Sequence, residues 1–182
     1  MTSAEVAAWV QAVGSILAIA GALGAAIWQA RLQHKNALAL IVLQQRQAQI
    51  ERTRTLNALV HNAASAVAHA TGLFNTRQAV HDVAEGRVNL DRGELERVDN
   101  TFATIPLHDL PSALVSPTMV VASVVRQFRE KVELVISAHR HMHGEEFDDL
   151  FRVLGEMNNR LLSTSDDIVK IAAKIEHELA AP

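Results

Sequence analysis

The hydrophobic pattern of the chain begins with a long uncharged run from Val6 to Trp28, in which the only polar side chains are Gln11 and Ser15. At about 1.5 Å of rise per residue, a helix over this run is roughly 34 Å long, enough to cross a hydrocarbon core of about 30 Å. The run predicts a transmembrane anchor over residues 1–30. A cleaved signal peptide and a buried helix of a soluble protein remain as alternatives.

Beyond residue 30, apolar residues recur at steps of three and four, the period of helices that bury one face. Gly86, the prolines at 106 and 111, and Gly144 interrupt this pattern. The pattern therefore predicts a second domain, residues 31–182, with helices at about 31–84, 91–105, 117–143 and 145–180. The expected fold class is all-α, with the transmembrane helix continuing into a cytoplasmic antiparallel helical bundle. The β-branched start of the third helix leaves a strand as an alternative there.

Two apolar stretches of the second domain leave open whether they pack within one chain or against a second copy. Ala37 to Leu43 is apolar on every side of a helix, but it is too short to cross a bilayer, so the bundle or a second copy should cover it. From Phe147 to Leu179 the apolar steps alternate between four and three, as in a coiled-coil seam with polar breaks at Asn158 and Ser165. This seam can pack within one chain or between chains.

The distribution of charged residues predicts how the chain is oriented across the membrane. The only charged residue before the predicted span is Glu5, whereas Arg31 and Lys35 follow it closely and form a basic juxtamembrane flank. Positive flanks stay on the cytoplasmic side, so the N-terminus should lie outside and the body inside. The prediction is a single-pass protein of the inner membrane, with the lipid bilayer as a partner. The residues after Arg54 are acidic overall, which argues against nucleic acid as a partner.

Small residues at i, i+4 spacing form a possible packing face on the predicted anchor. The face consists of Gly14, Ala18, Ala22 and Ala26. Small residues let two helices approach closely in lipid, which predicts self-association of the anchor. The alternative is that alanine and glycine are simply abundant in this run.

The anchor also carries a resemblance. The motif Trp9-x-Gln11-Ala12-x-Gly14-Ser15-Ile16, followed by a run rich in alanine and isoleucine, is similar to the N-terminal anchors of uncharacterised single-pass bacterial and phage membrane proteins. The resemblance covers residues 1–30. It implies a bacterial or phage origin, and it implies no activity.

Residues that could support catalysis or bind metal are few. The chain has no cysteine, which excludes disulfides and zinc–thiolate sites. His139 and His143 lie four apart, which on a helix would allow both to face one metal ion, but a site needs further ligands, such as His108, Asp148 or Asp149. We predict no metal, no cofactor and no catalytic residue. A metal-dependent enzyme built on the histidines is the alternative.

These features together predict a membrane-tethered helical scaffold, adaptor or regulatory protein rather than an enzyme. It should self-associate and act on a protein partner that the sequence does not identify. The alternative function is a phage or bacterial membrane-active protein, either a lysis regulator or a defence effector, whose anchor assembles in the bilayer.

Overall fold

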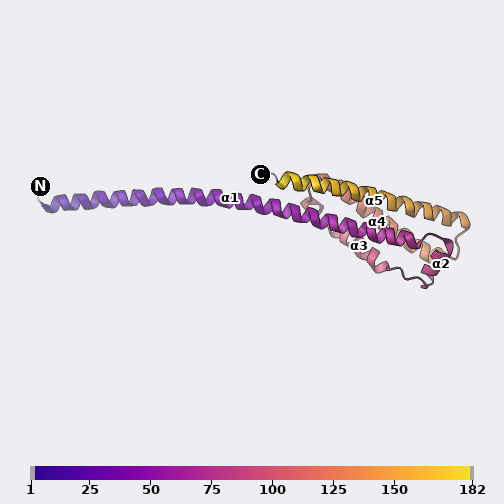
Figure 1. The fold of residues 1–182 in the computed structure, drawn as a ribbon. Coiled ribbons are helices and arrows are strands. Elements are labelled where there is room, and N and C mark those ends of the chain that lie inside the picture. The colour runs from indigo at the N-terminus through magenta and orange to yellow at the C-terminus, as the bar shows by residue number, and fades with distance from the viewer. Residues whose placement is uncertain (1–2, 181–182) are drawn as a thin grey trace. The chain divides into compact units, whose positions relative to one another are not determined.

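A computed structural model of the chain describes the backbone of residues 3–180 and the side chains of residues 14–15 and 21–179. Within this part the chain forms five α-helices, one turn of 3₁₀ helix and no strand (Figure 1). The all-α prediction is confirmed, and the segment that could have been a strand lies inside a helix. The chain divides into two compact units, Met1–Gln47 and Ala48–Pro182.

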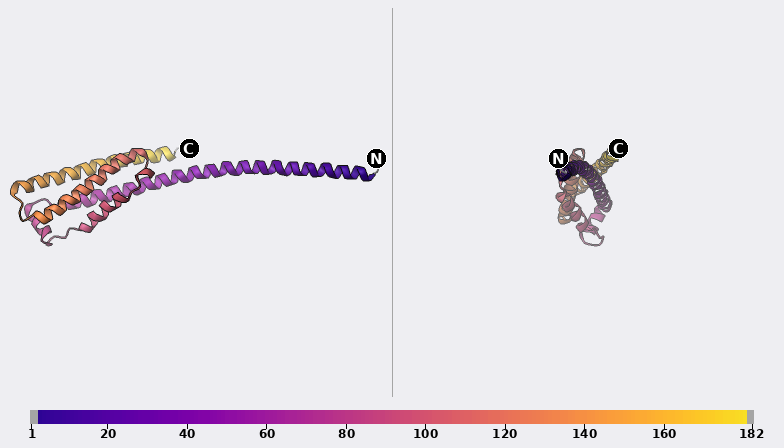
Figure 2. Two further views of the ribbon diagram at one scale, coloured as in Figure 1. Left: turned by 180° about the vertical axis from the view of Figure 1, so that it is seen from behind. Right: turned by 90° about the vertical axis from the view of Figure 1, so that its left-hand side faces the viewer.

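The second unit is a bundle of helices. The elements of the chain are α1 (Ser3–Leu73), α2 (Arg77–Ala84), α3 (Arg92–Thr104), η1 (Leu107–Asp109), α4 (Ser112–Ala138) and α5 (Gly144–Ala180). In the bundle α4 is central, because it packs against α5, α3 and α2 (Figure 2). The part of α1 that begins at Ala48 supplies the remaining long helix.

The core of the bundle forms where the apolar stripes of these helices meet. α1, α4 and α5 contribute most of the side chains that are almost completely inaccessible, among them Val60, Val67, Val121, Val125, Phe128, Leu154, Leu161 and Ile168. The last three belong to the predicted seam of α5. Because Leu161 and Ile168 are fully buried within a single chain, this seam packs inside the bundle and not between copies.

The structure divides the long helix that the sequence predicted over residues 31–84. α1 ends at Leu73, and α2 starts after an N-cap at Thr76, whose hydroxyl oxygen accepts a hydrogen bond of 3.2 Å from the backbone N–H of Ala79. Phe74 lies between them and is buried. The threonine cap favours the start of a new helix here, because its hydroxyl oxygen accepts a hydrogen bond from one of the N–H groups that the first turn leaves without a partner.

The bounds of α4 also differ from those expected. It begins at Ser112 and contains Pro117, where a start at Pro117 was predicted. Proline lacks a backbone N–H, so the helix loses the hydrogen bond that residue 117 would donate to the backbone carbonyl of Ala113. Only this one bond is lost, and its acceptor lies in the first turn. The earlier start buries Leu114 completely, which favours it. At the other end α4 stops at Ala138, so that His139 and His143 do not share a helix.

The predicted membrane location is wrong for the part of the chain that the structure describes. Among those residues, no helix is long and apolar enough to cross a bilayer. In α1 the apolar residues up to Trp28 are followed by a mainly polar segment that contains Arg31 and Lys35, and the apolar run Ala37–Leu43 is too short. Most of the predicted anchor, residues 1–13 and 16–20, lies outside the side chains described.

Candidate protein-interaction surface

Most of the large apolar side chains that are exposed in the described chain belong to α1. Every residue from 21 to 45 is exposed. The large apolar side chains among them have exposed fractions between 43% and 69%, and they are Leu23, Ile27, Trp28, Leu32, Leu38, Leu40, Ile41, Val42 and Leu43. We call this set the exposed apolar segment of α1.

Such a segment needs a covering partner for two physical reasons. Isolated helices are marginal in water, because most helical stability in proteins comes from packing an apolar face. Contiguous exposed apolar surface otherwise marks a site of interaction. The run Ala37–Leu43 is apolar on all sides of the helix, a pattern typical of a helix that is covered all round.

Four of the predicted site residues on α1 lie in the same exposed stretch, residues 21–45, and they are Ala22, Ala26, Arg31 and Lys35. Arg31 and Lys35 are exposed, and so are Gly14, Ala22 and Ala26, whereas the side chain of Ala18 lies outside those described. A Cβ atom added at Gly14 would meet no neighbour within 4 Å. The packing face of small residues therefore stays a prediction.

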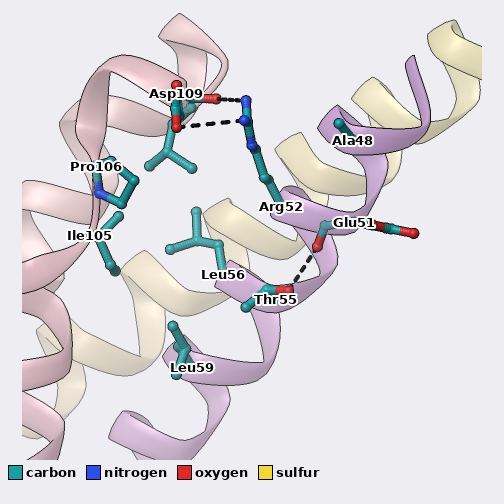
Figure 3. A pocket seen from close by; sticks show the side chains of 10 residues that line it. Ala48, Glu51, Arg52, Thr55, Leu56, Leu59, Ile105, Pro106 and Asp109 are labelled. Carbon is teal, nitrogen blue, oxygen red and sulfur yellow. Dashed lines mark hydrogen bonds and ion pairs between the residues drawn. The ribbon is translucent and has the colours of Figure 1, made fainter. Parts of the chain in front are cut away.

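Within the bundle unit, an apolar pocket of about 340 Å³ opens between α1 and the segment that joins α3 to α4 (Figure 3). Its apolar wall consists of Leu56, Leu59, Ile105, Pro106 and Leu110. This volume is at the lower end of the roughly 300–1,000 Å³ that ligand pockets have, so it suits a single apolar side chain or a small molecule.

An ion pair crosses one side of that pocket. The Arg52 guanidinium lies 3.5 Å from the Asp109 carboxylate and donates a long hydrogen bond of 3.4 Å to the Asp109 backbone carbonyl (Figure 3). Both side chains are partly exposed, and an exposed ion pair contributes at most about 1 kcal/mol. The pair therefore holds the connecting segment against α1 only weakly.

A second polar feature of the bundle lies where α2, the end of α4 and the start of α5 meet. The His139 ring is buried, its Nδ1 is 2.8 Å from the Ile136 carbonyl oxygen, and its Nε2 has no hydrogen-bond partner. The His81 ring meets the His139 ring edge-on, with centroids 5.2 Å apart, and also packs near Phe147. Among the described residues, no three histidine or acidic side chains come close enough to hold a metal ion.

The structure thus places the histidines differently from the arrangement that their spacing in the sequence allowed. His139 and His143 are placed in a turn and not on one helix face, while His139 contacts His81, which is 58 positions earlier (139 − 81). No spacing in the sequence signals that contact, because only the packing of α2 against α4 produces it.

Sequence reasoning also missed the pocket beside Arg52, since its walls come from two segments that are far apart along the chain. Comparisons of this chain with protein families, with curated proteins and with solved structures found no match.

Proposed function

We propose that this protein is a helical scaffold or adaptor that acts through protein–protein interaction, with the exposed apolar segment of α1 as its contact surface. The observation that supports the proposal is the concentration of large exposed apolar side chains between Leu23 and Leu43. The bundle unit buries its own apolar stripes, so it does not need a partner for stability.

The division of the chain agrees with that role. The exposed apolar segment lies within the unit that ends at Gln47, and the core of the bundle lies within the unit that starts at Ala48. A contact surface and a self-sufficient folded unit on one chain are the parts that a scaffold needs. The role we propose involves no catalysis.

Photo-crosslinking tests the proposal in cells that express the full chain. A benzophenone amino acid at Leu40 should give protein adducts, because Leu40 is 59% exposed and lies in the middle of the segment. The matched control carries the same group at Ala58, an exposed position of the same helix within the bundle unit, where few adducts are expected. Adducts with lipid alone at Leu40, or equal protein adducts at both positions, would contradict the proposal.

A further inference from the structure

We propose that the contact between α2 and the end of α4 is an acid-sensitive switch, in which uptake of a proton by His139 releases α2 from the bundle. The inference is independent of the proposed function, because every residue that it uses lies in the unit that starts at Ala48. It rests on a buried imidazole nitrogen that has no hydrogen-bond partner among the described residues.

The hydrogen bonds of His139 show which form of its ring fits the folded chain. His139 is 8% exposed, and its Nδ1 lies 2.8 Å from the backbone carbonyl oxygen of Ile136. Since a carbonyl oxygen only accepts, Nδ1 carries a hydrogen and donates it, and Nε2 of the neutral ring is left as an acceptor. Nε2 is closed off from solvent as well as from polar groups of the described chain. The neutral ring therefore fits this site.

A proton on Nε2 would change the energetics of the site. It turns the atom into a charged N–H donor, and the packed site offers that donor no acceptor. A charged group that is buried without a partner costs more than a neutral one. An imidazole in water takes up a proton near about pH 6.5. The packed contact should therefore lose stability as the pH falls, because the released form takes up a proton more readily.

A second imidazole adds to this effect. The ring of His81, on α2, meets the His139 ring edge-on with centroids 5.2 Å apart, and it also lies 5.9 Å from the Phe147 ring of α5. His81 is partly exposed, so water can solvate it when it is charged. Two positive charges this close repel each other, and separation of α2 from α4 relieves the repulsion.

The charges contributed by the start of α2 and by α5 are paired with each other. The Arg77 guanidinium lies 6.0 Å from the centroid of the Phe147 ring, and it forms an ion pair of 3.4 Å with the Asp148 carboxylate. Both charged side chains are exposed, so solvent screens them. This pair offers no buried acceptor to the His139 ring.

The carboxylate after the end of α2 is also bound elsewhere. The charge of Glu85 interacts with those of His139 and Arg140, which by itself favours a charged imidazole. Arg87 has a larger effect, since it donates a hydrogen bond to the Glu85 carboxylate and lowers its pKa. Glu85 is exposed and makes no hydrogen bond to Nε2, so it does not replace the missing acceptor.

Release of α2 would uncover an apolar surface that the folded chain hides. α2 is eight residues long, packs on α4, and buries Val80 and Val83. A helix this short is not stable by itself in water, so it should unfold once it leaves α4. The core of α5 around Leu161 and Ile168 lies outside this contact and should stay folded.

Hydrogen exchange of the purified full chain at several pH values tests the inference. After correction for the intrinsic effect of pH on amide exchange, protection at 80–84 should fall about fivefold between pH 6.5 and pH 5.5. This is the change expected when release takes up one proton near pH 6.5. Protection at 154–168, in α5, should stay the same. No fall at 80–84, or an equal fall in both stretches, would overturn local release.

Two variants remove the titrating ring in different ways. His139→Asn keeps an N–H donor for the Ile136 carbonyl, and His139→Phe keeps an aromatic ring. In both, the pH-dependent fall at 80–84 should disappear, and either one decides the question if the other does not fold. The matched control His141→Asn changes an exposed histidine two positions away and should keep the fall. A fall that persists without the His139 ring, or that disappears in the control, would contradict the inference.

Discussion

Two stretches of the same helix, residues 21–45 and residues 53–73, differ in how their apolar side chains are covered. In the second, apolar side chains such as Val60 and Val67 form one stripe that the bundle covers completely. In the first, the apolar side chains point in every direction and all are exposed. Helix formation is thus the same in both, and the difference lies in what covers the helix.

The comparison teaches that apolar content alone does not locate a core. A stripe on one face, with polar residues on the other, is matched to neighbours in the same chain. An apolar surface that surrounds the helix requires more neighbours than the described part of this chain supplies to residues 21–45. The bundle stretch should therefore govern the stability of a single chain, and the exposed stretch should govern association.

Truncating a leucine in each region tests this difference most severely. Leu161→Ala should lower the free energy of unfolding by about 2–5 kcal/mol, because it opens a cavity in a fully buried site. Leu40→Ala should change it by less than about 0.5 kcal/mol in the dissociated chain. Urea unfolding followed by circular dichroism at low protein concentration measures both. Similar losses of unfolding free energy in the two variants would contradict the difference between the two stretches.

Polar contacts in the bundle should also differ according to burial. The Asp99 carboxylate is buried and accepts hydrogen bonds from the Nε groups of Arg129 at 3.0 Å and Arg126 at 3.5 Å. Asp99→Asn should cost about 1–3 kcal/mol, as the loss of charged hydrogen bonds at a buried site does. The control Glu133→Gln removes an exposed partner of Arg129 and should cost no more than about 0.5 kcal/mol. A larger loss for Glu133→Gln would contradict this assignment.

The break between α1 and α2 gives a smaller effect. Thr76→Ala removes the hydroxyl that accepts the Ala79 N–H and should cost about 1 kcal/mol in thermal or urea unfolding. Thr104→Ala is the control, because that hydroxyl only donates to the Thr101 carbonyl at an exposed position and caps no helix start. If both variants unfolded alike, the cap would not be what holds this break.

The smallest predicted effect is on the stability of the folded chain in acid. Hydrogen bonding from Arg87 lowers the pKa of the Glu85 carboxyl in the folded chain, and the charge of Arg87 adds to this. A lowered pKa stabilises the folded state above the ordinary pKa of glutamate, and this contribution is lost as the pH falls through the folded value. Glu85→Gln should therefore have a slightly lower Tm than the unmodified chain at neutral pH and the same Tm in strong acid. A gap that widens in acid would contradict this.

Much of the bundle could be predicted because its signals are local. The three-and-four spacing of Val121, Phe128 and Leu161 located their helices and their buried faces, and Asp91 caps the start of α3 through its side chain, 2.9 Å from the Glu94 N–H. The break at Thr76 was missed because a threonine is common inside helices as well as at their ends.

Other features could not be read from the sequence, since they depend on tertiary packing. The meeting of His81 with His139 and the pocket beside Arg52 both combine segments that are far apart along the chain. The membrane location was inferred from apolar content and flanking charge, without knowledge of what covers the helix. Because the sequence does not show what covers residues 21–45, this is the part of the chain whose role most needs measurement.

Hydrogen–deuterium exchange of the full chain, recorded on the purified protein and on its complex with the protein that photo-crosslinking at Leu40 captures, tests the central claim on one helix. The account predicts that amides at 37–43 exchange quickly in the purified chain and slowly in the complex, because the partner covers them. Amides at 56–70, which the bundle covers, should remain protected in both. Equal exchange at 37–43 in the two samples would contradict the account.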